Sequence, residues 1–268
     1  MAAAEPTIEV ERPWLSTAAT AWAWLGYAFL ILPTLIVIPL SFNSTTELAF
    51  PPRSPSFHQY RQYFSDAGWI DATLLSVWIA ILSAGLSLLL GVPAAYGLSR
   101  GSFPGKTALS GLLLGPALTP VIVMALGLYI YFSHLGLSGV AMPIVLGHTL
   151  IAIPFVIVTT MSGMRHIDRN LEVAGMIMGG SHFYVFRKIT LPLLRPSILA
   201  SGLFAFLISF DEVIIAFFLS KAGNPTLAVK IFASIQWEIS SIIAAISTLL
   251  TLLSLVVCLF VAALLEKK

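Results

Sequence analysis

The chain has 268 residues, of which 58% are hydrophobic and only 10% are Asp, Glu, Lys or Arg, and its mean hydropathy is +0.95. Water-soluble domains carry roughly a quarter of their residues as those four charged types, so the composition excludes the soluble classes and indicates a membrane protein. The net charge of +2 is too small to indicate nucleic-acid binding. A single cysteine, Cys258, excludes an internal disulfide framework and a cysteine-based metal site.

Six apolar runs are long enough to cross the ~30 Å hydrocarbon layer, which takes about 20 helical residues. They lie near residues 22–42, 73–99, 107–131, 139–162, 197–219 and 240–264. The two-residue alternation of a membrane β-barrel is absent from these runs, so helices are the spanning elements. We therefore predict an all-α polytopic membrane protein with six transmembrane helices in a single domain over residues 1–268.

The distribution of Lys and Arg predicts the orientation of these helices. An even number of spans places both termini on one side of the membrane. If that side is the cytoplasm, ten of the 14 basic residues lie on the inside. These ten are Arg12, Arg100, Lys106, Arg165, Arg169, Arg187, Lys188, Arg195, Lys267 and Lys268. The termini and segment 163–195 are thus predicted to be cytoplasmic, with segments 43–70 and 220–238 on the opposite side.

The outer segment 43–70 is too long to be a simple turn. Three prolines near its middle and an aromatic-rich stretch at 57–64 predict an extended strap followed by a short amphipathic helix at the membrane interface. An anchor that rests on the lipid headgroups and a direct docking role both fit this pattern.

The inner segment 163–195 has signals for a first short helix. Asn170 is a good N-cap, and Glu172 falls in the first turn, where a carboxylate suits the helix dipole. Gly179 and Gly180 end this helix, since glycine readily adopts the left-handed conformation of a helix C-terminus. Helical spacing predicts one apolar face made of Leu171, Ala174, Gly175 and Met178.

A second short helix is predicted to begin at Ser181 and to stop at Pro192. It would bury Phe183, Phe186 and Ile189 and expose Arg187 and Lys188. Two short helices joined at a glycine corner form a rigid knob, which is a shape suited to binding by a partner protein.

Residues 171–181 and 186–196 resemble the EAA loop of permease subunits in binding-protein-dependent ABC importers. The residues at the family's spacing are Glu172, Ala174, Gly179, Ile189, Leu191 and Pro192. The chain departs from the pattern at Val173, where a second acidic residue is common, and at Gly175, where alanine is common. The resemblance implies a type I ABC importer permease fold and an ATPase-coupling role for Glu172, Ala174, Gly179 and Pro192.

The same resemblance implies the partners and the location of the chain. These are a separate ATP-binding cassette subunit that receives segment 163–195, a second permease subunit, an extracytoplasmic solute-binding protein and the bacterial inner membrane. A phosphate-binding Gly-x4-Gly-Lys-Ser/Thr run is absent, so ATP is expected to be hydrolysed on the other chain. No cofactor is expected.

Two further stretches, 209–213 and 230–232, are similar to the second permease subunit of spermidine/putrescine-type importers. That similarity implies a small cationic or zwitterionic, polyamine-like solute. Importers for opines, amino-acid derivatives or phosphonates remain alternatives.

Asp211 and Glu212 are the charged residues inside the fifth predicted span. Inserting such a residue at a helix centre costs about 2.5 to 3.5 kcal/mol, so it normally faces a cavity or a partner. Neighbours on a helix point about 100° apart, so both cannot face one cavity squarely. We predict that they belong to the translocation pathway, Asp211 more directly than Glu212. Pairing within the helix bundle is the structural alternative.

The second function class to weigh is an intramembrane enzyme that would use Asp211 and Glu212. It would need a further carboxylate, histidine or serine element at the same depth, and none stands out. His148 has no possible metal ligand at i+3 or i+4, so we expect a packed histidine bonded to a backbone carbonyl and no metal site. Pro116 and Pro120 predict a kink or unwound turn in the third span.

Overall fold

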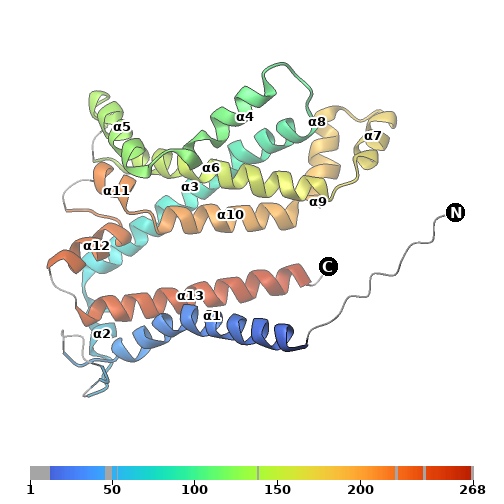
Figure 1. Ribbon diagram of the computed structural model, residues 1–268. Coiled ribbons are helices and arrows are strands. Elements are labelled where there is room, and N and C mark those ends of the chain that lie inside the picture. Colours follow the sequence, from blue (N-terminus) through green and yellow to red (C-terminus); the bar gives the residue numbers. More distant parts are fainter. Residues whose placement is uncertain are drawn as a thin grey trace. The chain divides into compact units, whose positions relative to one another are not determined.

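The computed structural model describes residues 13–45, 50–52, 54–137, 139–220, 223–237 and 240–266. Within these ranges the regular secondary structure is helical, with one isolated bridge between Asn43 and Pro55, which confirms the all-α prediction (Figure 1). The elements are α1 (Pro13–Leu40), α2 (His58–Ser65), α3 (Ala67–Arg100), α4 (Lys106–Leu114), η1 (Gly115–Leu118), α5 (Val121–His134), α6 (Ala141–Arg165), α7 (Arg169–Ile177), α8 (His182–Val185), η2 (Phe186–Thr190), α9 (Leu191–Leu193), α10 (Arg195–Phe210), α11 (Ile214–Leu219), α12 (Leu227–Trp237) and α13 (Ser241–Glu266).

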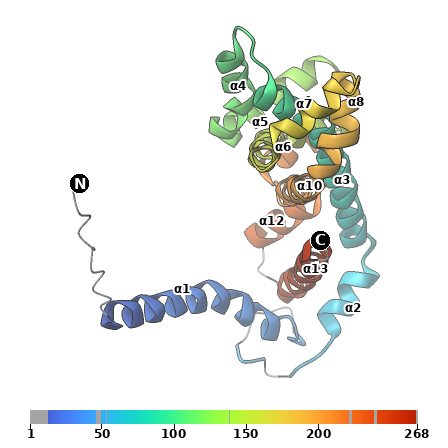
Figure 2. The ribbon, with the colours of Figure 1, turned by 90° about the vertical axis from the view of Figure 1, so that its right-hand side faces the viewer.

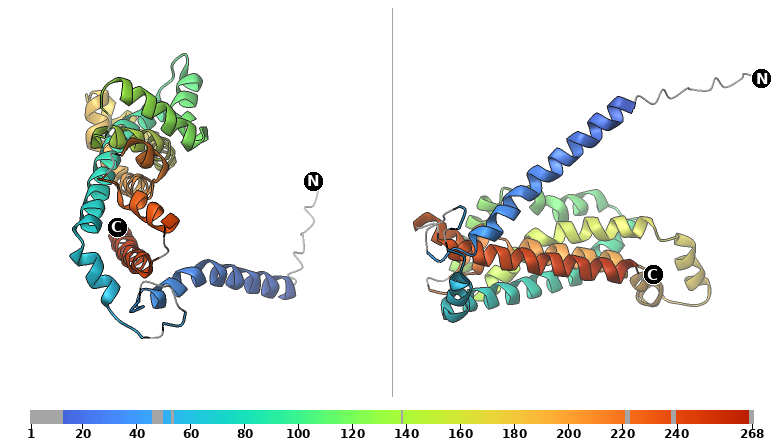
Figure 3. Two further views of the ribbon diagram at one scale, coloured as in Figure 1. Left: turned by 90° about the vertical axis from the view of Figure 1, so that its left-hand side faces the viewer. Right: turned by 90° about the horizontal axis from the view of Figure 1, so that it is seen from below.

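The chain divides into two compact units, one of Met1–Ser65 with Ile239–Lys268 and one of Asp66–Glu238. In the first unit α13 contacts both α1 and α2. Helix α1 diverges from α13 along its length, and its residues 19–36 are exposed (Figure 3). The predicted short helix of the outer segment is present as α2. The single domain over residues 1–268 stays a prediction.

Helices α3, α6 and α10 pack side by side in the second unit (Figure 2). Small residues spaced four apart on α3 allow α6 to approach closely. The Ser83 hydroxyl donates to the Val145 carbonyl at 3.1 Å, and a β-carbon at Gly91 would lie 2.7 Å from Cγ1 of Val156. This is the packing mode of membrane helices, in which small side chains bring two backbones together.

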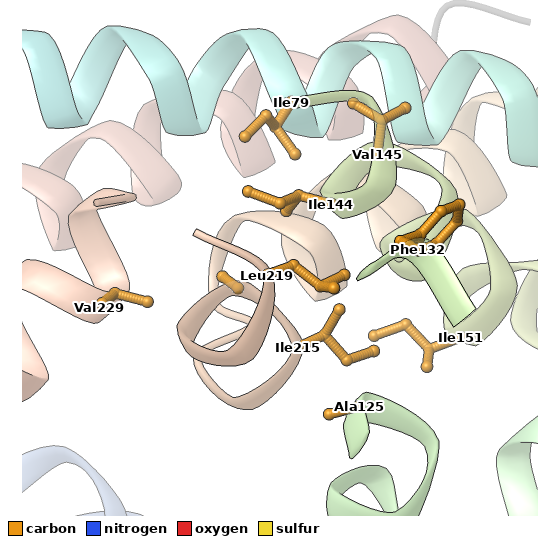
Figure 4. Close-up of a cluster of buried hydrophobic side chains, with 10 residues drawn as sticks. Ile79, Ala125, Phe132, Ile144, Val145, Ile151, Ile215, Leu219 and Val229 are labelled. Atoms are coloured by element: carbon orange, nitrogen blue, oxygen red, sulfur yellow. The ribbon is translucent and has the colours of Figure 1, made fainter. Parts of the chain in front are cut away.

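A hydrophobic cluster in the same unit joins α3, α5, α6, α11 and α12 (Figure 4). Its members are Ile79, Ala125, Phe132, Ile144, Val145, Ile151, Ile215, Ala216, Leu219 and Val229. Through these apolar contacts, the short helix α11 packs against the longer helices α3, α5 and α6.

Three helical segments are long and apolar enough to span a membrane: Ala19–Leu40, Ala67–Arg100 and Ala141–Arg165. The number rises to five if each of two bent pairs counts as one span. In these pairs Lys106–Leu118 meets Val121–His134 at 101°, and His182–Leu193 meets Arg195–Phe210 at 76°. Ser241–Val256, within the sixth predicted span, is a shorter apolar helix among the described residues.

Two predicted spans differ from the structure. The third, 107–131, is not one helix, because the 3-10 turn η1 interrupts it beside Pro116 and Pro120, where the predicted kink is confirmed. The fifth, 197–219, is also broken, because α10 ends at Phe210 and α11 begins only at Ile214. Hydropathy alone missed this second break since the residues on both sides of it are apolar.

Candidate functional site

The knob, residues 168–194, lies at one end of the α3, α6 and α10 bundle, opposite α5, α11 and α12 (Figure 1). Its first helix begins two residues earlier than expected. Asp168 is the N-cap of α7, and its carboxylate accepts from the Asn170 backbone N–H at 2.9 Å. The expectation of Asn170 as N-cap is therefore wrong, whereas Glu172 does lie in the first turn.

The corner after α7 forms as predicted. Gly179 has a φ of +90°, a conformation that strains any residue with a β-carbon. The Gly180 N–H donates to the Gly175 carbonyl at 3.1 Å and the Gly179 N–H to the Met176 carbonyl at 3.0 Å. These two bonds form a Schellman motif and satisfy carbonyls that the helix end would leave free. Ser181 then caps α8.

Three of the four residues of the predicted apolar face of α7, Leu171, Ala174 and Met178, are exposed, and the fourth, Gly175, is buried. The second buried residue of α7 is Glu172. The helix therefore packs on its own chain through Glu172 and Gly175 and leaves most of the apolar face free. A glutamate can take that position only where partners compensate its charge.

The second helix of the knob also differs from the expectation. Phe183 is 70% exposed rather than buried, and Phe186 and Ile189 are only half-buried. Val185 and Thr190 are the buried residues. The reason is the π-helical turn at Phe186–Thr190, which holds more residues per turn than an α-helix. Arg187 and Lys188 are exposed, as predicted.

Glu172 links three parts of the molecule. Its Oε2 accepts from the Arg100 Nε–H at 3.0 Å, and its Oε1 accepts from the Thr190 hydroxyl at 2.9 Å. Arg100 also donates from Nη2 to the Ile167 carbonyl at 3.1 Å. The side chains of Glu172 and Arg100 are 5% and 19% exposed. The last residue of α3 is thereby tied to the start of α7 and to the π-turn.

The remaining predicted coupling residues shape the knob. Gly175 packs closely against η2, since a β-carbon there would lie 2.6 Å from Cδ1 of Ile189. Pro192 lies in the first turn of α9, where its missing N–H leaves no helical bond unmade. Ala174 is on the exposed side of α7.

The second group of predicted site residues stands at the break between α10 and α11. Asp211 caps the C-terminus of α10 through its backbone N–H, which donates to the Leu207 carbonyl at 3.1 Å. Asp211 is exposed, and among the described residues its carboxylate has no hydrogen-bond or ion-pair partner. Because the helix stops here, Asp211 and Glu212 are not neighbours on one continuous helix, and the expected angle of about 100° between them does not apply.

Glu212 has a different environment from its neighbour. Its side chain is 8% exposed, and its carboxylate accepts from the backbone N–H groups of Ile214 at 2.9 Å and Ala216 at 3.1 Å. These donors are free at the start of a helix, and a carboxylate is favourable there. Glu212 thus starts α11, which supports the structural alternative for this residue.

His148 completes this group. It is buried, as expected, but its partners are side chains and not a backbone carbonyl. Nδ1 lies 2.8 Å from the Ser209 hydroxyl, and Nε2 lies 3.4 Å from Oε2 of Glu212 without forming a hydrogen bond. Sequence reasoning missed this contact because Ser209 is 61 residues away in the chain.

Among the described residues, no third metal-ligating side chain joins His148 and Glu212. Within the ranges that the structure describes, no group of three or more His, Cys, Asp or Glu residues could hold a metal ion.

Arg100 lies at the last residue of α3, and a second basic residue, Lys230, lies near the first turn of the same helix. Nζ of Lys230 lies 4.4 Å from the centre of the Trp69 ring, beside the N-cap residue Asp66. Burial lowers the pKa of Lys230 from its usual range, while the carboxylates of Asp66 and Asp71 act in the opposite direction. This contact attaches α12 to the start of α3.

Comparison with known proteins shows several permeases of similar length. The chain is 32% identical to the spermidine/putrescine transport system permease protein PotC of Haemophilus influenzae, over 88% of this chain and 91% of the relative. It is 32% identical to the putrescine transport system permease protein PotI of Escherichia coli, over 84% and 83%. The trehalose transport system permease protein SugB of Mycobacterium tuberculosis is 29% identical over 74% of each chain.

Solved structures share the fold. A chain of a bacterial ABC transporter involved in the import of the acidic polysaccharide alginate superposes with a TM-score of 0.71 at 15% identity, over 98% of this chain and 99% of that one. A structure of the bacterial alginate ABC transporter in complex with an alginate pentasaccharide-bound periplasmic protein gives 0.69 at 18% identity, over 94% of each chain.

Residues 87–268, more than half of the chain, match the family described as binding-protein-dependent transport system inner membrane component. Members of this family are transport subunits, which decides against the intramembrane enzyme. The knob, the broken helix pair and these matches agree: the chain belongs to this family and is a multi-pass inner-membrane permease subunit of an ABC importer.

Proposed function

We propose that this permease imports a small organic cation of the polyamine class. In this proposal it forms the pathway with a second permease subunit, receives its solute from an extracytoplasmic binding protein and is driven by a separate ATP-binding subunit. The knob is the observation on which the proposed drive by ATP rests. It has no ATPase domain of its own, so a separate ATP-binding subunit would have to bind it.

The exposed apolar tip of the knob supports docking of the ATP-binding subunit. Ile177 is 82% exposed, Met178 80% and Phe183 70%, and all three lie within seven residues of one another around the corner. Such a patch at the end of a membrane bundle is typical of a protein interface. Exposed Arg187 and Lys188 add positive charge to the same knob.

The four proposed coupling residues act from different places. Ala174 lies on the exposed side of α7, where a partner can contact it. Glu172, Gly179 and Pro192 act indirectly, since they set the position and the shape of the knob. In this proposal a movement of the ATP-binding subunit reaches α3 through the bond between Glu172 and Arg100.

Asp211 is the proposed pathway residue for a cationic solute. Its carboxylate is exposed at the C-terminus of α10, where the helix dipole also contributes negative potential. Helix breaks of this kind supply binding groups for ions and substrates in many transporters. A polyamine, or an opine or amino-acid derivative with an ammonium group, suits this charge better than a phosphonate does.

Substrate class can be tested with the whole transporter in proteoliposomes, with ATP enclosed and the binding protein outside. We expect uptake of labelled putrescine or spermidine, competition by excess unlabelled polyamine and no competition by trehalose. Uptake of trehalose instead, or competition by an amino-acid derivative alone, would reject the polyamine assignment.

Orientation is proposed with both termini and the knob in the cytoplasm. Cysteines at Asn170 and Asn224 in a Cys258→Ser background test this, since both positions are exposed, neither has a positive φ and neither belongs to the apolar tip. In intact spheroplasts, an impermeant thiol reagent should label the cysteine at Asn224 and should reach the one at Asn170 only after membrane opening. The reverse order would overturn the topology.

A further inference from the structure

Two adjacent carboxylates stand at the break between α10 and α11, in different surroundings. We propose that His148 is a positioning residue of the translocation pathway: it holds Glu212 within the break, so that Asp211 presents the uncompensated charge to a passing cation. The inference rests on the pathway role proposed for Asp211. It assigns a function to a buried histidine that the coupling mechanism does not use.

The imidazole of His148 reaches both sides of the end of α10. Nδ1 lies 2.8 Å from the hydroxyl of Ser209, in the last turn of α10, and Nε2 lies 3.4 Å from Oε2 of Glu212, beyond that turn. One ring nitrogen faces the Ser209 hydroxyl and the other faces the Glu212 carboxylate, so these two partners orient the ring.

Burial makes this contact important for Glu212. The side chains of His148 and Glu212 are 1% and 8% exposed. A carboxylate so far from water is strongly unfavourable unless hydrogen-bond donors and an opposite charge compensate it. The N–H groups of Ile214 and Ala216 supply the donors, and His148 supplies the cationic or polar partner.

Packing next to His148 fixes the same region. A β-carbon at Gly147 would lie 2.7 Å from Cγ2 of Ile215, so α11 approaches α6 at the residue beside the histidine. Ile215 is fully buried in the cluster of Figure 4. Helix α6 therefore contacts α11 through Gly147 and Ile215, and it contacts the two sides of the break through His148. Asp211 lies in the break, between the end of α10 and these two contacts.

The test is a double-mutant cycle in the complete reconstituted transporter, with labelled putrescine as the probe. We expect His148→Leu and Glu212→Gln each to lower kcat/KM for uptake about tenfold, and the double variant to be no worse than the poorer single variant, because each removes the same contact. His148→Gln, which retains an N–H donor, should recover much of the rate. His134→Leu is the matched control, since His134 is an exposed histidine at the end of α5.

A positioning role also predicts that the substitution changes the KM for putrescine. His148→Leu should raise KM for putrescine in the wild-type background and leave KM unaltered in an Asp211→Asn background, because the Asp211 charge that this positioning presents to the solute is then already removed. Effects that multiply independently in both cycles would mean that His148 only fills space, and would overturn the inference.

A readout without substrate separates this inference from the proposed function. The thermal unfolding midpoint of the purified complex should show the same non-additivity between His148→Leu and Glu212→Gln. If the wild type transports no putrescine, the substrate assignment fails, and the unfolding cycle still decides whether the pair exists. If His148→Leu does not assemble, His148→Ala, which also lacks the ring N–H groups, takes its place in both cycles, and additivity there rejects the pair.

Discussion

The knob and the break each contain a buried glutamate next to a basic side chain from another helix, but the two pairs differ. Glu172 accepts two hydrogen bonds, from Arg100 at 3.0 Å and from Thr190 at 2.9 Å. Glu212 lies 3.4 Å from His148 without a hydrogen bond to it. Arg100 also bonds to the Ile167 carbonyl, whereas Nε2 of His148 makes no hydrogen bond to Glu212.

This difference fits two mechanical tasks. A permanent and fully bonded pair suits the knob, which must move as one body with the end of α3 if it is to transmit force. A looser pair suits the break, where the proposed pathway would let a solute pass. Four substitutions test this contrast, and their expected effects decrease from the first to the last.

Removing the arginine of the knob should have the strongest effect. Arg100→Leu leaves the Glu172 carboxylate buried without its cation, a change that costs about 3 kcal/mol for pairs of this kind. ATP-driven uptake is expected to fall by about a hundredfold, with ATP hydrolysis no longer stimulated by loaded binding protein. Arg169→Leu is the matched control, because Arg169 is exposed on the same knob. Normal stimulation in Arg100→Leu would show that the knob does not act through α3.

Neutralising the exposed carboxylate of the break should act on the solute rather than on coupling. Asp211→Asn is expected to lower kcat/KM for putrescine about tenfold, the size of a lost charge contact of about 1.4 kcal/mol. Assembly and basal ATP hydrolysis should be unchanged, since Asp211 is exposed. Asp211→Glu, which keeps the charge, should retain most uptake. Full activity of the asparagine variant would remove Asp211 from the pathway, and loss of assembly would assign it a structural role.

Position 179 should tolerate only residues that can adopt the left-handed backbone conformation of Gly179. A β-carbon at Gly179 would meet open space, so strain at φ +90° is the expected cost of Gly179→Leu, about 1 to 2 kcal/mol. Coupling between ATP hydrolysis and uptake should fall severalfold while membrane insertion is normal. Gly179→Asn should be milder, since asparagine adopts this conformation more readily. Equal behaviour of the two variants would argue against backbone strain.

The weakest effect is expected where the chain departs from its family's pattern. Gly175→Ala places a methyl group 2.6 Å from Cδ1 of Ile189, the flexible end of a side chain that can move. A loss below about 1 kcal/mol is expected, offset in part by the better helix propensity of alanine. Thermal unfolding of the purified complex would measure it. The shorter side chain of Ile189→Val should relieve the clash, and no relief would mean that the methyl group meets something else.

Several features could be predicted because their signals are local. The apolar runs, the short helix after the strap, the glycine corner and the kink near Pro116 each depend on residues close together in the chain. The structure contains all four. The break after Phe210 lacks a proline or a glycine, and its two charged residues, Asp211 and Glu212, do not by themselves indicate that a helix ends.

Short stretches of sequence were enough to predict that this protein lies in a membrane, that it is all-α and that it has a knob at residues 168–194. Hydropathy, glycine placement and motif spacing are local properties, so each can be recognised without the fold. Tertiary structure decided which side chains face inward. Glu172 meets Arg100 across 72 residues and His148 meets Ser209 across 61, and no periodicity encodes such distances. The environments of Asp211 and Glu212 diverge for the same reason: they are neighbours in the chain, and only the packing of α6 against α11 places one in the interior and the other outside.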